Sequence, residues 1–257
     1  MTGDACEGPA DARTHRVDGV SNFRDFGGYA LARGGALARG RCFRSAHLAG
    51  LTAAGEHILD ELAIATVIDL RGAHERTRAP ASLSGSSAIA VVTAPIEPRV
   101  TRHVRGELAA GTLTPSGMRA LMIETYRGFV RDHASEFGVA LAAMAAASGR
   151  PLLIHCTAGK DRTGFLVALV HALLGVERDT VLADYAATNS AWDRASVGDL
   201  LAFDPATVEP LLAADPDYLD AAFAEIARID GSPAAFLART TAGRVAPAAF
   251  DTLTSEI

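Results

Sequence analysis

The sequence contains few cysteines. Its 257 residues include only three, Cys6, Cys42 and Cys156. Three thiols cannot all pair in disulfide bonds, and no two of them have the spacing of a zinc-binding or redox-active pair. We therefore expect reduced thiols, and the chain does not have the pattern of a disulfide-stabilised or cysteine-ligated metal protein.

Long apolar runs free of charge are also missing. No stretch of about 18 residues has the composition of a membrane-spanning helix. The segment Met1–Glu7 lacks the basic and apolar regions of a secretory signal peptide. These features predict a cytoplasmic protein, and they leave open an export route that needs no signal peptide.

Positive charge is not in excess. Lys and Arg number 24 against 30 Asp and Glu, which gives a formal net charge of −6. Such a chain has no general attraction for nucleic acid or anionic lipid. We therefore expect no nucleic-acid partner and no stable membrane attachment, and an anionic substrate must be bound by a local site. Composition does not determine the oligomeric state.

The sequence does contain enough apolar residues for a large core. Hydrophobic residues make up 49% of the chain, a fraction typical of globular proteins. We expect a single domain over residues 18–257. It is preceded by a polar segment without clear periodicity, residues 1–17, which is interpreted as a flexible arm.

Strand and helix patterns alternate along this domain. Short apolar runs predict strands at 41–45, 65–70, 89–95 and 151–154. Helical spacing of apolar residues predicts helices at 52–62, at 116–147 as two helices that meet near His133, and at 163–174. The alternation predicts an α/β fold with a central, mostly parallel sheet flanked by helices.

Two regions are harder to interpret. The polar stretch 97–115 has no assignable pattern, and we interpret it as a loop over the site. The part after Gly175 is predicted to be helical throughout, broken into short pieces by Pro205, Pro210 and Pro216. Within it, the segment 192–218 is open to two interpretations, a lid over the site or an ordinary helical cap.

One segment has the residues that phosphate chemistry requires. His155-Cys-Thr-Ala-Gly-Lys-Asp-Arg-Thr-Gly164 lies between an apolar strand and an apolar helix, where phosphate-binding loops are found. The backbone N–H groups of such a loop converge on phosphate oxygens, and the helix N-terminus adds positive potential. Arg162 can bind two of the oxygens at once.

Cys156 is the candidate nucleophile. A thiol at a helix N-terminus beside cations is largely ionised at neutral pH, and its attack on phosphorus forms a phosphocysteine that water hydrolyses. Arg162 and the amides would stabilise charge on the oxygens, Thr163 would stabilise the departing thiolate, and Gly159 permits the tight turn. The alternative is that Cys156 is a small buried apolar residue in an ordinary strand-to-helix turn.

This loop resembles the signature loop of the protein tyrosine phosphatase superfamily. With Lys160 and Asp161 it is similar to a bacterial branch of atypical tyrosine and lipid phosphatases that includes a secreted mycobacterial enzyme. Further matching segments follow in the same order over residues 17–250: Asn22–Asp25, Phe43–Ser45, Asp69–Arg71 with Glu75, Tyr126–Arg127, and Asp184–Tyr185 with Asn189.

The resemblance implies a tyrosine-phosphatase-like fold, no metal and no cofactor. It implies hydrolysis of phosphotyrosine in proteins, with phosphoserine, phosphothreonine or phosphoinositides as further substrates. Substrate binding is carried over to the loop residues Thr157, Ala158, Gly159, Lys160, Thr163 and Gly164. Lys160 is similar to a lysine that meets extra phosphate charge in lipid phosphatases of the superfamily, and a solvated loop lysine is an equal alternative.

The leaving group needs a proton donor. Tyrosine phosphatases usually provide an aspartate on a Trp-Pro-Asp loop upstream of the cysteine, but the single tryptophan here, Trp192, lies downstream. The resemblance points instead to Asp161 as the general acid, beside the catalytic Arg162. The alternatives are that Asp161 only orients Arg162 or caps the helix, with Asp25 and Asp69 as weaker candidate acids.

Six residues are predicted to support the loop: His155, Asp69, Arg71, Asn22, Arg24 and Asp25. Asp69 and Arg71 follow a buried strand at its carboxyl end, where α/β proteins place their sites, and a structural ion pair explains them equally well. The segment 22–25 would brace the loop or simply end a strand. His155 is expected to tune the thiolate through a local hydrogen bond. Tyr126 is open to a place in the pocket wall or in the core.

Three rival functions stay open. A phosphoinositide phosphatase is favoured by Lys160 and disfavoured by the acidic net charge and the lack of a basic amphipathic helix. A catalytically silent phosphate-binding module is disfavoured by the intact Cys156, Asp161 and Arg162. Sulfur or arsenate redox chemistry would need Cys42 as a second thiol. We therefore predict a metal-independent phosphomonoesterase with protein phosphotyrosine as its first substrate.

Overall fold

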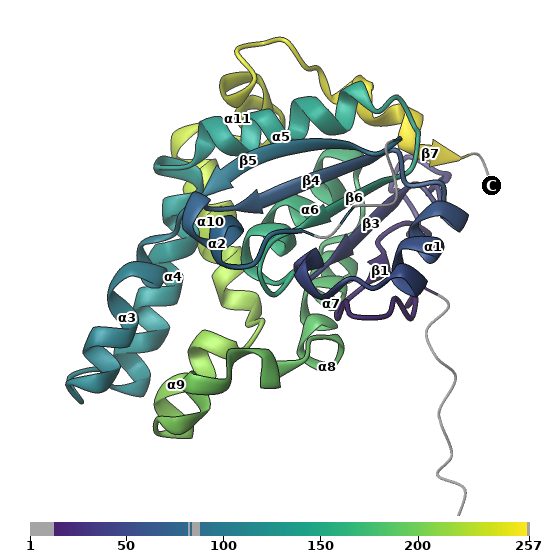
Figure 1. Ribbon diagram of the computed structural model, residues 1–257. Coiled ribbons are helices and arrows are strands. Elements are labelled where there is room, and N and C mark those ends of the chain that lie inside the picture. The colour runs from purple at the N-terminus through teal and green to yellow at the C-terminus, as the bar shows by residue number, and fades with distance from the viewer. Residues whose placement is uncertain (1–12, 82, 84–87, 256–257) are drawn as a thin grey trace, which may run out of the picture.

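A five-stranded sheet forms the centre of the molecule. The computed structural model describes residues 13–81, 83 and 88–255. The strands are β1 Arg24–Asp25, β3 Cys42–Ser45, β4 Thr66–Arg71, β5 Ala90–Ile96 and β6 Leu152–His155. Their order is β1-β3-β6-β4-β5, with the β1–β3 pair antiparallel and the other pairs parallel (Figure 1). The predicted α/β fold with a mostly parallel central sheet is confirmed.

Both faces of the strands β3, β4 and β6 are buried, and successive side chains of each strand point to opposite sides. Leu152 and Ile154 of β6 belong to the larger core, whereas Leu153 belongs to a smaller core with Leu59 of α1 and Val17. A small second sheet pairs β2 Ala36–Leu37 with β7 Thr254–Ser255. The two-sided burial explains why the central strands are continuous apolar runs.

Helices surround the sheet (Figure 1). They are α1 Ala53–Glu61, α2 Ala73–Arg78, α3 Arg99–Ala109, α4 Pro115–Arg131, α5 Ala134–Ala146, α6 Asp161–Leu174, α7 Arg178–Ala186, α8 Thr188–Ala191, α9 Pro205–Leu212, α10 Pro216–Ile229 and α11 Pro233–Thr240. The described residues also contain the 3₁₀ helices η1 Leu48–Gly50, η2 Arg194–Ala202 and η3 Pro247–Leu253. Among the residues described, no helix is both long enough and apolar enough to cross a membrane.

Several helices begin at a proline that follows a capping residue. The pairs are Thr114-Pro115, Asp204-Pro205, Asp215-Pro216 and Ser232-Pro233. Each capping side chain accepts a hydrogen bond from a backbone N–H of the first turn, and the proline removes an N–H that would lack a partner there. Pro205 and Pro216 therefore start helices, while Pro210 lies inside α9. The expectation that these prolines interrupt helices was only partly right.

The stretch 97–115 differs from its prediction as a loop, because most of it is helix α3. Val100, Val104 and Leu108 recur every four residues and are buried, a spacing that places them on one face of a helix. Helix α6 starts at Asp161, two residues earlier than predicted, whereas the two helices predicted around His133 are confirmed.

The predicted N-terminal arm lies only partly within the described residues. Residues 1–12 are outside them. Thr14 forms a bridge with Arg24, and Val17 is buried in the smaller core. From Thr14 onward the chain is therefore part of the packed structure and not of an arm.

We predict that Gly138→Ala destabilises the protein. Helix α5 approaches α11 so closely that a Cβ at Gly138 would lie 2.1 Å from the carbonyl oxygen of Thr240. We expect the free energy of unfolding, measured by urea denaturation, to fall by about 1–3 kcal/mol. Gly106→Ala is the control, since a Cβ at this position in α3 would meet nothing within 4 Å. It should be neutral or stabilise the helix by up to about 1 kcal/mol, and equal losses in both variants would contradict this account.

Candidate active site

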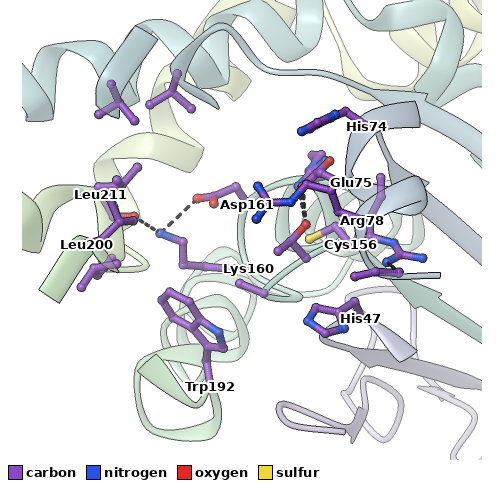
Figure 2. A pocket seen from close by; sticks show the side chains of 18 of the residues that line it. His47, His74, Glu75, Arg78, Cys156, Lys160, Asp161, Trp192, Leu200 and Leu211 are labelled. Carbon is purple, nitrogen blue, oxygen red and sulfur yellow. Dashed lines mark hydrogen bonds and ion pairs between the residues drawn. The ribbon is translucent and has the colours of Figure 1, made fainter. Parts of the chain in front are cut away.

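Three parallel strands end at the same place. β6 lies between β3 and β4, so the residues that follow these strands meet at one edge of the sheet. His47 follows β3, Arg71 ends β4 and Cys156 follows β6, and all three line a cavity of about 470 Å³. Figure 2 shows His47 and Cys156 in this cavity. The loop contributes further polar lining, namely Thr157, Lys160, Asp161 and Arg162.

The loop is held from the side away from the cavity. Asn22 Nδ2 donates hydrogen bonds to the carbonyl oxygens of Ala158 and Gly159, at 2.9 and 3.1 Å, and Arg44 Nη2 donates to Gly159 O at 2.8 Å. In a trans peptide the N–H points opposite to the C=O, so the N–H groups of Gly159 and Lys160 point away from these donors. Gly159 has φ +66°, and a Cβ there would lie 2.3 Å from Ser45 O.

Buried charges support this anchoring. Arg44 forms an ion pair with Asp184 at 2.8 Å, and both side chains are almost fully buried. Arg24 donates to Asn22 Oδ1 and to Asp184 O. Burial and the neighbouring Arg44 lower the pKa of Arg24 to about 10. The Asp184 carboxylate pairs with Arg44, whereas Arg24 reaches only the backbone carbonyl of Asp184. Two arginines near one carboxylate leave net positive charge behind the loop.

The residues of the segment 22–25 therefore have different roles. Asn22 contacts the loop directly and Arg24 holds Asn22, which is the predicted brace. Asp25 does not take part, because its carboxylate accepts from Gly27 N and Gly40 N, each at 2.7 Å, and shapes a turn. Asp25 does not line the cavity either, so its interpretation as a weaker candidate acid has no geometric support.

Arg162 is held by a carboxylate that we did not predict as a site residue. Its Nη1 and Nη2 donate to Glu75 Oε2 and Oε1 at 2.6 and 2.8 Å, and Nη1 also donates to Ile96 O at 3.0 Å. Glu75, on α2, accepts from the hydroxyl of Thr157 as well. Burial alone would raise the pKa of Glu75, but the hydrogen bonds and charge of Arg162 outweigh it and lower the pKa to about 2.

Asp69 and Arg71 form a buried ion pair. Arg71 Nε and Nη2 donate to Asp69 Oδ1 and Oδ2 at 3.0 and 2.8 Å. His155 Nε2 lies 3.8 Å from Asp69 Oδ2, and its Nδ1 lies 3.3 Å from Cys156 O, which is the predicted local contact. Burial lowers the pKa of His155 to about 4, so the imidazole is neutral at pH 7. Both carboxylate oxygens of Asp69 accept hydrogen bonds from Arg71, which argues against Asp69 as the general acid.

Asp161 lies in the first turn of α6 and lines the cavity. Its Oδ1 accepts a hydrogen bond from the hydroxyl of Tyr126 at 2.9 Å and lies 3.4 Å from Lys160 Nζ. The residue at the helix N-cap is Lys160, so Asp161 does not cap the helix. The carboxylate is bonded to Tyr126, and Glu75 is the residue that orients Arg162.

Lys160 is buried, with 2% of its surface exposed, so the interpretation as a solvated loop lysine is wrong. Its Nζ donates to Leu211 O at 2.5 Å and to Ala213 O at 3.1 Å, at the end of α9, and lies over the Trp192 ring (Figure 2). With Asp161 as third partner, the ammonium group has three acceptors, as many as it has protons. Burial lowers its pKa against the effect of Asp161.

The segment 192–218 forms one wall of the cavity. The apolar residues Trp192, Leu200, Leu211 and Leu212 come from it, and Val100 and Val104 of α3 contribute further apolar surface. The basic residues Arg78 and His74 of α2 also line the cavity (Figure 2). The sequence analysis did not identify His74, Glu75 and Arg78 as site residues. Their position shortly after the carboxyl end of a predicted strand was a signal that could have found them.

Three further residues named in the sequence analysis are Thr163, Gly164 and Cys42. Thr163 is fully buried, and its hydroxyl has no hydrogen-bond partner among the residues described. A Cβ at Gly164 would lie 2.8 Å from the ring of Tyr185, so this glycine permits helix packing. Cys42 lies in the larger core, outside the cavity lining, and burial raises the pKa of its thiol. No cluster of three or more His, Cys, Asp or Glu residues suited to a metal ion occurs in the described ranges.

We predict that the contribution of Glu75 to stability depends on pH. The pKa of Glu75 is about 2 in the folded protein against an ordinary value of 4.5, so its pairing with Arg162 stabilises the fold above pH 4.5 and is lost as the pH falls toward 2. Glu75→Gln should lower the free energy of unfolding at pH 7 by on the order of 3 kcal/mol. Urea denaturation at pH 7 and pH 3 should show a smaller difference between wild type and variant at pH 3. A difference independent of pH would contradict this assignment.

Comparisons with known proteins place the chain in a family. The tyrosine phosphatase family matches residues 15–254. A candidate tyrosine-protein phosphatase of Cupriavidus necator is 36% identical over 179 residues, which cover 67% of this chain and 62% of that protein. The triple specificity protein phosphatase PtpB of Mycobacterium tuberculosis is 32% identical over 194 residues, which cover 68% of this chain and 69% of that protein.

A solved structure shows a weaker likeness. The crystal structure of TpbA from P. aeruginosa aligns with 71% of this chain and 87% of its own, with 18% identity and a TM-score of 0.32, which is too low to support an assignment. The family match and the identity to PtpB, together with the loop that follows β6, are sufficient to assign the family. The chain belongs to the tyrosine phosphatase family.

Proposed function

We propose that this protein is a cysteine-dependent phosphatase that hydrolyses phosphotyrosine in proteins. The observation that carries the proposal is the position of Cys156. Its thiol lies in the cavity at the end of the central strand, in a loop whose Gly159 and Lys160 N–H groups point away from Asn22 and Arg44. Arg162 lines the same cavity. This arrangement suits a phosphate group bound over the sulfur.

The first chemical step forms a phosphocysteine. The sulfur of Cys156 bonds to phosphorus while the bond from phosphorus to the leaving oxygen breaks, and that oxygen takes a proton from Asp161. Arg162 and the loop amides stabilise the charge on the other phosphate oxygens. Glu75 keeps the guanidinium in place through two hydrogen bonds, so little ordering of Arg162 is needed when substrate binds.

The second step releases phosphate. A water molecule gives one proton to the Asp161 carboxylate, and its oxygen bonds to phosphorus as the bond from phosphorus to sulfur breaks. The electron pair returns to Cys156 as a thiolate. Thr163, whose buried hydroxyl has no partner among the described residues, suits the role of a donor to this sulfur. The full cycle needs no group beyond the chain and water.

The cavity walls support an aromatic phosphate ester as substrate. Trp192, Leu200 and Leu211 form an apolar side, and Arg78 and His74 lie on another. An apolar wall suits the ring of a phosphotyrosine, and the guanidinium of Arg78 suits its phosphate and acidic flanking residues. A phosphorylated protein as partner and a cytoplasmic place of action are parts of the same proposal. Phosphoserine and phosphothreonine are included as weaker substrates of the same site.

We predict that Cys156→Ser abolishes turnover. Phosphate release from phosphotyrosine peptides, measured with a metal chelator present, should fall to the level without protein, because a serine hydroxyl is not ionised at neutral pH. Cys42→Ala is the matched control and should keep the wild-type kcat, since this thiol lies in the core. Loss of turnover in the control alone would favour the redox alternative, and an inactive reduced wild type would favour a phosphate-binding module.

We predict that Lys160→Met changes kcat/KM equally for lipid and protein substrates. All three acceptors of its ammonium group belong to the protein, so the substitution should lower the melting temperature and change kcat/KM on a phosphotyrosine peptide and on a short-chain phosphoinositide by the same factor, within about threefold. A loss confined to the phosphoinositide would instead assign Lys160 to extra phosphate charge and favour a lipid phosphatase.

A further inference from the structure

Two buried tyrosines lie behind the candidate acid. Tyr126 of α4 and Tyr185 of α7 are at most 1% exposed, and their hydroxyl oxygens are 2.5 Å apart. The Tyr126 hydroxyl is also 2.9 Å from Asp161 Oδ1. Burial and the nearby Asp161 carboxylate raise the pKa of both phenols, so both are neutral donors over the whole working pH range.

The direction of these hydrogen bonds follows from proton counting. An ionised carboxylate only accepts, and a phenol has one proton to donate. Tyr126 uses its proton on Asp161 Oδ1, so Tyr185 must be the donor in the pair of phenols. The result is a one-way chain from Tyr185 through Tyr126 to Asp161.

This chain of hydrogen bonds leaves one carboxylate oxygen of Asp161 available for proton transfer. The hydrogen bond from Tyr126 and the ion pair with Lys160 both end on Oδ1. A proton taken up by Asp161 is therefore favoured on Oδ2, while Oδ1 still accepts from Tyr126. We propose that Tyr126, with its hydroxyl directed by Tyr185, is a positioning residue that fixes the Asp161 carboxyl so that Oδ2 carries the proton to the leaving group.

Packing keeps the three groups in register. Gly164 of α6 allows the Tyr185 ring to lie against the helix that carries Asp161, since a Cβ there would be 2.8 Å from the ring. The Tyr126 ring packs against Phe129 and Tyr218. All three hydroxyl and carboxyl groups come from helices and not from loops, which limits their movement.

A purely structural role is the competing explanation, since buried phenols need hydrogen-bond partners. Tyr126 and Tyr185 could satisfy most of that need with each other. Asp161 is different, because 27% of its side chain is exposed and water could solvate it without Tyr126. The contact therefore does little for folding that solvent could not do, and its value lies in orientation.

This inference rests on the proposed function, and the test separates the two. The substrates are 4-nitrophenyl phosphate, whose leaving group departs with little need of a proton, and phenyl phosphate, whose leaving group needs one. Tyr126→Phe should lower kcat/KM on phenyl phosphate by about tenfold or more, and on 4-nitrophenyl phosphate by less than about threefold, because only general-acid catalysis is impaired. In an Asp161→Asn background, adding Tyr126→Phe should change neither rate further.

Tyr218→Phe is the matched control. It removes a phenol hydroxyl from the same aromatic cluster, but that hydroxyl donates to Pro210 O and not to Asp161, so no dependence on the leaving group is expected. If Tyr126→Phe fails to fold, Tyr185→Phe carries the test, with the same pattern at about threefold on phenyl phosphate.

The outcomes are distinct. Equal losses on both esters, or a loss that persists beside Asp161→Asn, would overturn the positioning role and leave the phosphatase intact. Wild-type protein that hydrolyses neither ester would overturn the proposed function, and the inference with it.

Discussion

Parallel pairing of β3, β6 and β4 is the constraint on which the site depends. It brings the carboxyl ends of three strands, far apart in the chain, to one edge of the sheet. The loop after β6 can then be anchored by residues near β1 and β3, Asn22 and Arg44, while α2 after β4 supplies Glu75. The same edge is where open α/β sheets generally bind ligands.

Paired charges around the loop are a second constraint on the site. Buried charges are costly unless they are paired, and the pairs here, Arg44 with Asp184, Arg162 with Glu75 and Asp69 with Arg71, are all made within the protein. The loop is therefore pre-organised, so that binding energy need not be used to order it. The charge of Arg24 behind the loop and the N–H dipoles of the loop are left to favour an anion.

The placement of the candidate acid follows from the same geometry. Without a Trp-Pro-Asp loop upstream, the proton donor has to come from elsewhere, and Asp161 lies where the loop ends, in the first turn of α6. Trp192 reaches the cavity from the downstream side and contacts Lys160. The loop and the segment 192–218 are thereby joined through one buried ammonium group, which donates to two carbonyl oxygens at the end of α9.

The sequence by itself determined the fold class and the reactive loop, because both depend on local patterns. Strand and helix periodicities and the spacing of Cys156 and Arg162 within one loop can be seen without a structure. Contacts between distant residues could not be predicted this way. Glu75 and Arg162 are 87 positions apart, and the partners of Tyr126 and Lys160 lie on other helices. Only the tertiary structure decided these contacts, because they depend on how strands and helices are arranged in space, and local sequence preferences do not specify that arrangement.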